Sequence, residues 1–263
     1  MTSDTTALDT AHAAMEAAPE DDAARLRFYE RLADSELFLL LSAEPEGEQV
    51  SPETFELADG RFVLAFDREE RLAQFTGRTS PYVALSGRVL AGMLAGQGIG
   101  LAVNPEVAPS AMLIPAEAMA WLAETLGHAP DEVEARIESV HPPADLPEVL
   151  LRALDTKLAT ATGLAQSAYL VAVRYEGGGQ GHLLGFVDAV EAAQGPLAKA
   201  ASEALTFSGI EAGAMDVGFF AASDPITARL ARVGLRFDLP QPQTMVPERI
   251  APGSDPDKPP RLK

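Results

Sequence analysis

The chain has 263 residues, no cysteine, and a net charge of −19 from 39 acidic and 20 basic side chains. The lack of cysteine excludes disulfides, thiolate catalysis, iron–sulfur clusters and cysteine-bound zinc, and the negative charge argues against binding to nucleic-acid phosphates. No apolar run approaches the roughly 20 residues that span a bilayer. The N-terminal segment carries Asp4 and Asp9 but no early basic residue, unlike the start of a signal peptide. We therefore expect a cytoplasmic protein with neither a membrane nor a nucleic-acid partner.

The first elements follow from hydrophobic periodicity. Apolar residues at helical spacing predict helices over 7–18 and 22–34. The first of these lies in acidic, Ala-rich surroundings, and we expect it to be loosely attached. Three strands should follow, and the pair Asp59-Gly60 favours a tight hairpin turn between the last two; these strands are predicted at Glu36–Ser42, Thr54–Leu57 and Arg61–Phe66.

Capping residues predict where the next helices begin. Asp67 has Glu70 three residues later, which is the spacing of a capping box. Ser86 can cap the following helix, whose apolar stripe should consist of Val89, Leu90, Met93 and Leu94. Pro115 suits the first turn of a helix that ends near Leu126. Strands between these helices are predicted at Tyr82–Leu85, Ile99–Val103 and Ala111–Ile114.

The second half shows the same mixture of elements. Apolar residues from Leu146 to Leu158 form a clear helical stripe. The glycine-rich stretch Gly177–Gly181 should join two antiparallel strands, and Asp224-Pro225 should open a late helix. The remaining elements are strands at Ser167–Tyr175, His182–Val187, Met215–Phe220 and Leu235–Asp238 and a helix over Pro196–Phe207. From Pro240 on, seven prolines in 24 residues exclude a helix or an interior strand.

The distribution of charge divides the chain into two halves, as the pattern of predicted elements does. Residues 1–143 carry 25 acids and 9 bases, a net charge of −16, whereas residues 144–263 carry 14 acids and 11 bases, a net charge of −3. The shift supports a boundary near His141-Pro142-Pro143. The sequence thus predicts an α+β fold of two small mixed-sheet domains with flanking helices. Its parts are an N-terminal helical extension (1–22), a first domain (23–143), a second domain (144–239) and a Pro-rich tail (240–263).

The first domain also resembles a known family, in its core positions and in a Gly-Arg and an Asn-Pro pair. The residues that carry this resemblance are Phe62–Phe66, Glu69–Leu72, Phe75, Tyr82, Ser86–Arg88, Leu90, Ile99–Pro105 and Pro115. They resemble the N-terminal domain of the SseB family, named for an enhanced serine sensitivity phenotype. The second half is similar to the SseB C-terminal domain, so the resemblance covers residues 23–238. It implies an α+β fold and brings no catalytic residue. The family commonly has Phe-Thr-Ser where this chain has Phe66-Asp67-Arg68.

Motifs of known chemistry are missing from the sequence. Its four histidines lie far apart, and none has a ligand-like neighbour four residues away. There is no Gly-x-Ser-x-Gly elbow. The run Gly177–Gly181 is followed by an expected strand, whereas a phosphate loop needs Lys-Ser/Thr at the start of a helix. We therefore predict no catalytic residue, no metal site and no cofactor.

One polar constellation stands out as a candidate binding pocket. Asn104 follows a continuous apolar strand and precedes Pro105, and strand ends in α/β architectures often bind ligands. With Tyr82 and Arg88 it forms the predicted pocket. The alternative interpretation is that Asn104 bonds the local backbone and shapes the turn.

These observations favour a noncatalytic binding or adaptor protein. It would bind another protein through the acidic first domain or through a groove between the domains. The alternative interpretation of the acidic surface is that it only keeps the protein in solution. The second hypothesis is a small-molecule sensor or enzyme with a pocket near Asn104, Tyr82 and Arg88. A third is self-association into a homo-oligomer, through sheet edges and the tail segment Met245-Val246.

Overall fold

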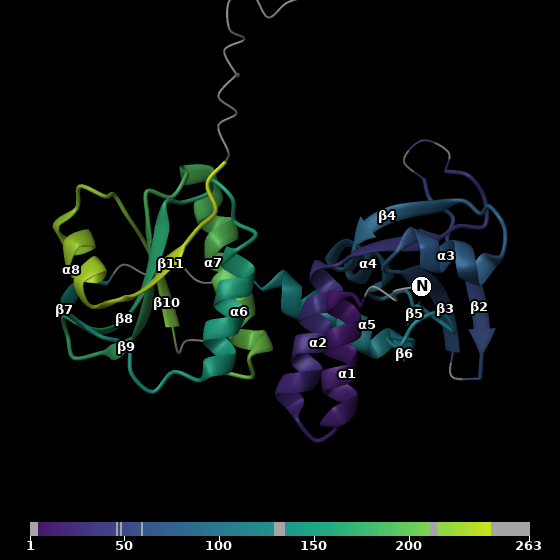
Figure 1. Ribbon diagram of the computed structural model, residues 1–263, viewed down its shortest axis with the longest axis horizontal. Coiled ribbons are helices and arrows are strands. Elements are labelled where there is room, and N and C mark those ends of the chain that lie inside the picture. Colours follow the sequence, from purple (N-terminus) through teal and green to yellow (C-terminus); the bar gives the residue numbers. More distant parts are fainter. Residues whose placement is uncertain are drawn as a thin grey trace, which may run out of the picture.

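A computed structural model describes residues 5–45, 47, 49–58, 60–128, 135–210 and 215–242. Their helices and strands form two bodies that lie next to each other along the longest axis of the molecule, each built on one mixed sheet (Figure 1). The predicted fold class, α+β with two mixed-sheet domains and flanking helices, is confirmed. Within the described residues no helix is both long enough and apolar enough to cross a membrane.

The first domain is built on a six-stranded sheet. Along its main path the strands have the order β4-β1-β3-β5-β6, and β2 also pairs with β3. Only the β3–β5 pair is parallel among these ladders. The elements of this domain are α1 (Ala7–Ala17), α2 (Asp22–Asp34), β1 (Glu36–Leu40), β2 (Thr54–Leu57), β3 (Gly60–Phe66), α3 (Glu69–Thr76), β4 (Tyr82–Ser86), α4 (Gly87–Leu94), β5 (Ile99–Val103), β6 (Met112–Ile114) and α5 (Ala116–Gly127).

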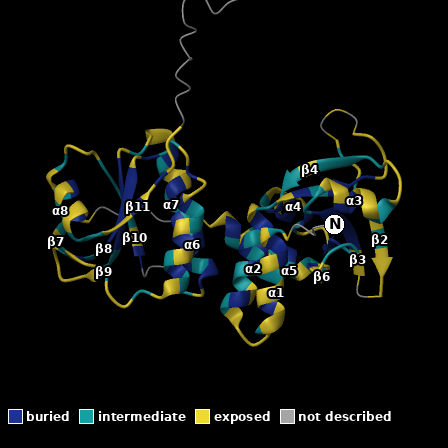
Figure 2. Ribbon diagram, in the orientation of Figure 1, coloured by how far each residue is buried: buried dark blue, intermediate teal, exposed yellow. Residues whose placement is uncertain are grey.

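Both faces of the first sheet are covered, which explains the unbroken apolar runs of β3 and β5. On one face, Val63 and Val103 pack with buried residues of α2, α4 and α5. On the other face, Phe62 and Phe66 form a smaller core with Leu72 of α3. Figure 2 shows that the outer strand β2, the loops and the outer helix faces are exposed, whereas β3 and β5 are mostly buried. The predicted hairpin is also present, with Leu57 opposite Gly60, although Asp59 of its turn lies outside the described residues.

The helix α1 is bound to the first domain more firmly than expected. Leu8 and Met15 belong to the same core as α2, and Thr6 and Asp9 form a capping box at the start of α1. The carboxylate of Asp9 reaches the guanidinium of Arg71 on α3. The expectation of a loose attachment is therefore wrong. Asp9 attaches α1 to α3 through its carboxylate, and the Ala-rich composition of the segment gives no sign of this contact.

Two details of the first domain differ from the sequence predictions. Asp67 does not cap α3, whose N-cap is Arg68; the Asp67 carboxylate instead accepts hydrogen bonds from Arg71 and Thr6. In α4 the predicted apolar stripe is only half buried, since Val89 and Met93 are exposed by 48% and 40%. The buried face consists of Gly87, Leu90, Ala91 and Leu94. Ser86 does cap this helix through the backbone nitrogen of Val89.

The second domain contains a five-stranded sheet of order β10-β9-β8-β11, with β7 also pairing with β8. Buried residues of α6 and α7 pack against one face of this sheet, and Leu230 of α8 packs against the other. Its elements are β7 (Ile137–His141), α6 (Glu148–Leu158), β8 (Ser167–Tyr175), β9 (Gln180–Val187), the 3-10 turn Glu191–Ala193, α7 (Gln194–Phe207), β10 (Met215–Phe220), α8 (Pro225–Val233) and β11 (Leu235–Asp238).

The strand β7 was not predicted from the sequence. It pairs with the end of β8, so the second sheet begins before the boundary proposed at residue 143. The register shifts between Ile137 and Ser139, and the residues that pack on the core, Ile137 and Val140, are three apart rather than two. A bulge of this kind removes the alternation by which a strand is recognised. The tail segment Met245-Val246 lies outside the described residues.

Candidate functional site at the domain junction

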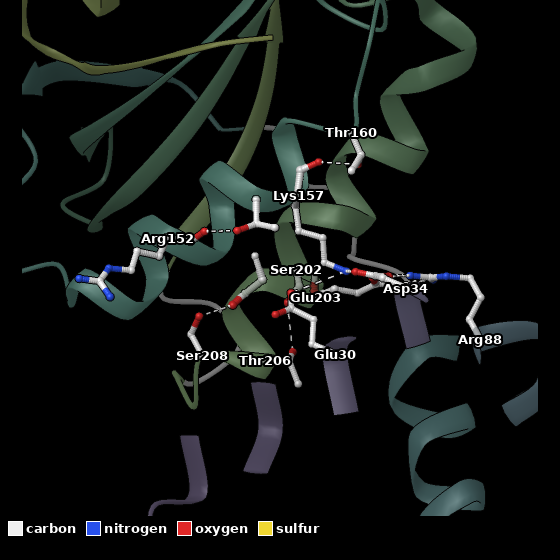
Figure 3. A network of polar contacts seen from close by, with 12 residues as sticks. Glu30, Asp34, Arg88, Arg152, Lys157, Thr160, Ser202, Glu203, Thr206 and Ser208 are labelled. Atoms are coloured by element: carbon white, nitrogen blue, oxygen red, sulfur yellow. Dashed lines mark hydrogen bonds and ion pairs between the residues drawn. The ribbon is translucent and has the colours of Figure 1, made fainter. Parts of the chain in front are cut away.

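Five charged side chains meet where helices of the two domains face each other (Figure 3). Glu30 and Asp34 belong to α2 and Arg88 to α4 of the first domain, whereas Lys157 belongs to α6 and Glu203 to α7 of the second. We call these five residues the junction cluster. Since they come from four helices and both domains, the cluster forms only when the domains are docked.

The local structure of the first domain explains how its three members come together. Glu30 and Asp34 are four residues apart on α2 and therefore share one side of that helix. Arg88 follows Gly87, the first residue of α4. A Cβ atom at Gly87 would lie 1.8 Å from the carbonyl oxygen of Leu32. Only glycine permits so close an approach of α4 to α2, and this approach places Arg88 beside Asp34.

The ion pairs of the cluster are short and shared. Lys157 Nζ lies 2.6 Å from Asp34 Oδ2, 3.0 Å from Glu203 Oε2 and 3.7 Å from Glu30 Oε1. Arg88 donates from Nη1 to Glu203 Oε1 at 3.0 Å and from Nη2 to Glu203 Oε2 at 3.1 Å. Its Nη2 also donates to Asp34 Oδ1 at 2.7 Å. Both cations therefore bridge the domains, and the fork of Arg88 fixes the orientation of Glu203.

Burial gives the carboxyl groups of the cluster different acidities. Glu30 and Glu203 are only 2% and 5% exposed. Burial raises the pKa of Glu30 more than the charge of Lys157 lowers it, and Glu30 Oε1 has no hydrogen-bond partner among the described atoms. Burial also opposes ionisation of Glu203, but the hydrogen bond from Arg88 and the charge of Lys157 outweigh it and lower its pKa. Within the cluster, the charge of Glu203 is thus stabilised by its hydrogen-bonded cation, whereas the charge of Glu30 is poorly stabilised.

The arrangement of the cluster favours docking over a reaction. Its cations occupy the space between the carboxylates, and within the part of the chain that the structure describes no group of three or more potential ligands could hold a metal ion. Its three acids and two bases neutralise one another when Glu30 is protonated. The chemistry that such a group supplies is a specific, hydrogen-bonded attachment of one domain to the other.

A largely apolar groove lies in the first domain next to the contact with α7. It lies between α2 and α5, has a volume of about 380 Å³, and is lined by Arg25, Leu26, Tyr29, Ala118 and Trp121. The ring of Trp121 contacts the ring of Tyr29 edge-on, with 5.3 Å between the centroids. The centroid of the Phe207 ring on α7 lies 6.5 Å from that of Trp121. Phe207 itself is buried in the core of the first domain. The groove is therefore held in shape by residues of both domains, while Trp121 remains 38% exposed.

The structure places the three predicted pocket residues in separate surroundings. Asn104 is fully buried; its Oδ1 accepts from the backbone nitrogen of Asp67 at 3.1 Å and its Nδ2 donates to Ser110 at 2.9 Å. Its φ of 46° lies in the left-handed region. This local bonding agrees with the alternative interpretation, in which Asn104 shapes the turn.

The other two residues of the predicted pocket have different partners. Tyr82 packs its ring against Phe38 at 5.5 Å, and a hydrogen bond with Glu69 raises its pKa. Arg88 is part of the junction cluster. None of the three lines the groove, or a second hollow of about 240 Å³ near the ends of β9 and β10.

Sequence reasoning missed most of the junction cluster and the groove. The one available signal was the acidic pair Glu30 and Asp34, four residues apart at the end of a helix that also buries Phe28 and Leu32. Their partner Lys157 is 123 residues away from Asp34 in the sequence. No spacing rule connects residues at that separation, so the contact requires the docked fold.

The fold and the junction define a class of protein: a two-domain α+β protein whose domains are joined by buried ion pairs. Residues 10–121 match the family model described as the SseB protein N-terminal domain. This match confirms the resemblance to the SseB family that the sequence predicted. It falls in the first domain, so the likeness of the second domain to the SseB C-terminal domain stays a prediction. No curated protein and no solved structure matches the chain.

Proposed function

We propose that this chain is a noncatalytic binding or adaptor protein of the cytoplasm, and that it binds another protein through the first domain close to the junction. The observation that carries this proposal is the groove between α2 and α5, where Tyr29 and the exposed Trp121 line an apolar surface. Aromatic residues of this kind are enriched at the energetic centres of protein interfaces.

The buried polar groups already pair with one another, which supports a binding role over a catalytic one. Arg71 pairs with Asp9 and Asp67 inside the first domain, and the charges of the junction cluster pair with one another. These groups hold helices and domains together. The surface charge adds a second argument, since the first 143 residues carry a net charge of −16 and would attract a basic partner at low ionic strength.

The proposal can be tested by crosslinking the full chain in a native extract and identifying what is captured. We expect a specific protein partner at low salt, captured less efficiently as salt screens the charges. A matched bait with W121S should capture less of the same partner, because it removes the exposed ring of the groove. If no protein is captured specifically, or if W121S and the original chain capture the same set equally, the proposal is wrong.

A further inference from the structure

We infer that the groove between α2 and α5 binds a basic, amphipathic segment of a partner protein, with an apolar side chain of that segment against Trp121. The inference rests on the proposed function and specifies the chemistry of the partner. Its evidence is the size of the groove, its apolar lining and the sign of the charges around it.

The size of the groove indicates a segment as the ligand. Its volume of about 380 Å³ lies near the lower end of the range for small-molecule sites, roughly 300–1,000 Å³, and so has room for a few side chains only. A folded surface would instead need a broad, flat face. The side chains of Leu26, Tyr29 and Trp121 provide an apolar floor. One face of an amphipathic helix is the common ligand for a floor of this kind.

Two exposed acids beside Trp121 favour a basic segment. Glu117 and Glu124 on α5 are exposed, and they stand four residues before and three residues after Trp121, on the same side of the helix. Among the described residues neither carboxylate takes part in an ion pair. The one cation in the lining, Arg25, is already paired with Asp22. An approaching Lys or Arg can therefore pair with Glu117 or Glu124, while an acidic segment would be repelled.

The same charges disfavour other occupants. Nucleic acids and anionic membrane surfaces carry the same sign of charge as Glu117, Glu124 and the chain as a whole. A second copy of this chain carries −19 and would meet a net repulsion on approach. The chain does have basic residues in its tail, Lys258, Arg261 and Lys263, and the experiment must distinguish them from a partner.

The chain provides its own reporter, because Trp121 is its single tryptophan. The experiment titrates the full chain with a synthetic helical peptide of Lys, Leu and Phe, without tryptophan, and follows the emission maximum and acrylamide quenching of Trp121. We expect a saturable blue shift and reduced quenching at low salt, because the ring leaves water. A peptide with Glu in place of Lys should have no effect. If the basic peptide leaves Trp121 unchanged, the inference is wrong.

Charge variants separate a specific site from general attraction. E117K/E124K should weaken peptide binding about tenfold, since two attractions become repulsions. The matched control E138K/E176K makes the same change of net charge on exposed acids of the second domain and should leave binding within about twofold. Equal weakening by both variants would overturn the inference. Circular dichroism and thermal unfolding establish that each variant folds.

Two further outcomes distinguish the inference from its rivals. If Trp121 of the full chain is already shielded and K258E/R261E/K263E exposes it, the occupant is the chain's own tail, and the inference of a partner segment is wrong. If crosslinking captures a partner but neither the partner nor the basic peptide changes Trp121 emission, the groove inference fails while the proposed function stands. Failure of the crosslinking experiment itself would instead count against the proposed function.

Discussion

The protein contains two clusters of ion-paired side chains, each with buried members, that differ in how their charges are compensated. Inside the first domain, Asp9 and Asp67 share a single cation, Arg71. At the junction, the three carboxyl groups of Glu30, Asp34 and Glu203 share the two cations Arg88 and Lys157. Each cluster therefore has one acid more than it has bases. The two clusters differ in what compensates for the surplus charge.

In the first-domain cluster, neutral donors supply the compensation. Asp9 accepts hydrogen bonds from the hydroxyl of Ser110 and from the backbone nitrogen of Thr6, in addition to those from Arg71. Burial alone would raise the pKa of Asp9, but these bonds together hold it far below its ordinary value. The hydroxyl of Thr6 donates to Asp67 at 2.6 Å. The carboxylate of Asp9 therefore stays ionised, and α1 is fixed to the end of the sheet.

At the junction, none of the described residues offers a neutral donor to Oε1 of the surplus carboxyl group, Glu30. Glu30 Oε1 has only the ammonium of Lys157 at 3.7 Å, too far for a hydrogen bond. Burial therefore raises the pKa of Glu30 more than the charge of Lys157 lowers it. The comparison teaches that a buried acid is held ionised by hydrogen bonds rather than by a nearby charge alone. It also indicates that the attachment between the domains depends on pH, whereas the attachment of α1 is constant over the same range.

The largest effect should come from removing the shared cation of the first-domain cluster. R71M leaves Asp9 and Asp67 buried without a positive charge, so the free energy of unfolding should fall by roughly 3–5 kcal/mol. Urea denaturation would measure this loss. R61M is the matched control: Arg61 pairs with Glu56 on the surface, and exposed pairs contribute less than about 1 kcal/mol. Equal losses for R71M and R61M would show that the first-domain cluster is not a structural anchor.

A smaller loss is expected when the junction loses its ammonium. K157M leaves Glu203 and Asp34 bonded to Arg88, and Glu30 can take up a proton. We therefore expect the free energy of unfolding to fall by roughly 2 kcal/mol. This loss is smaller than the one expected when a buried carboxylate is left without any cation. R152M, on the exposed side of the same helix α6, should cost less than about 0.5 kcal/mol. A loss for K157M as large as that for R71M would remove the difference between the two clusters.

The sequence predicted strands and turns whose signals are local, and it missed the ion pairs between residues that are distant along the chain. A short apolar run predicted the buried strand β5, and the pair Asp59-Gly60 between two strand-like segments predicted the β2–β3 hairpin, because both signals come from neighbouring residues. The role of Asp67 was predicted wrongly, since the local capping pattern competes with a buried Arg71 four residues later. The candidate site had still less local signal. Arg88 was selected for its place beside Asn104 and Tyr82, whereas its partner Glu203 lies 115 residues away.

The smallest and most informative effect concerns Glu30. Because its pKa in the folded protein is raised above the ordinary value of 4.5, the stability that goes with its protonated form is present below about pH 4.5 and is lost as the pH rises through the folded pKa. E30Q keeps a neutral group of similar shape at every pH. The variant should therefore be about 1 kcal/mol more stable than the original chain at neutral pH, and this advantage should disappear towards pH 4. Thermal unfolding over pH 4–8 would measure it.

E203Q provides the opposite control for the same measurement. The pKa of Glu203 is lowered in the folded protein, so its ionised form contributes stability above the ordinary value of 4.5 that is lost as the pH falls through the folded pKa. E203Q should thus be less stable than the original chain at neutral pH, and the deficit should shrink in acid. Opposite signs for E30Q and E203Q at neutral pH would establish that hydrogen bonding, and not burial, decides which acid holds the domains together. If E30Q destabilises the protein at neutral pH as E203Q does, the ion pair with Lys157 stabilises Glu30 despite its length, and the pH dependence proposed for the junction is wrong.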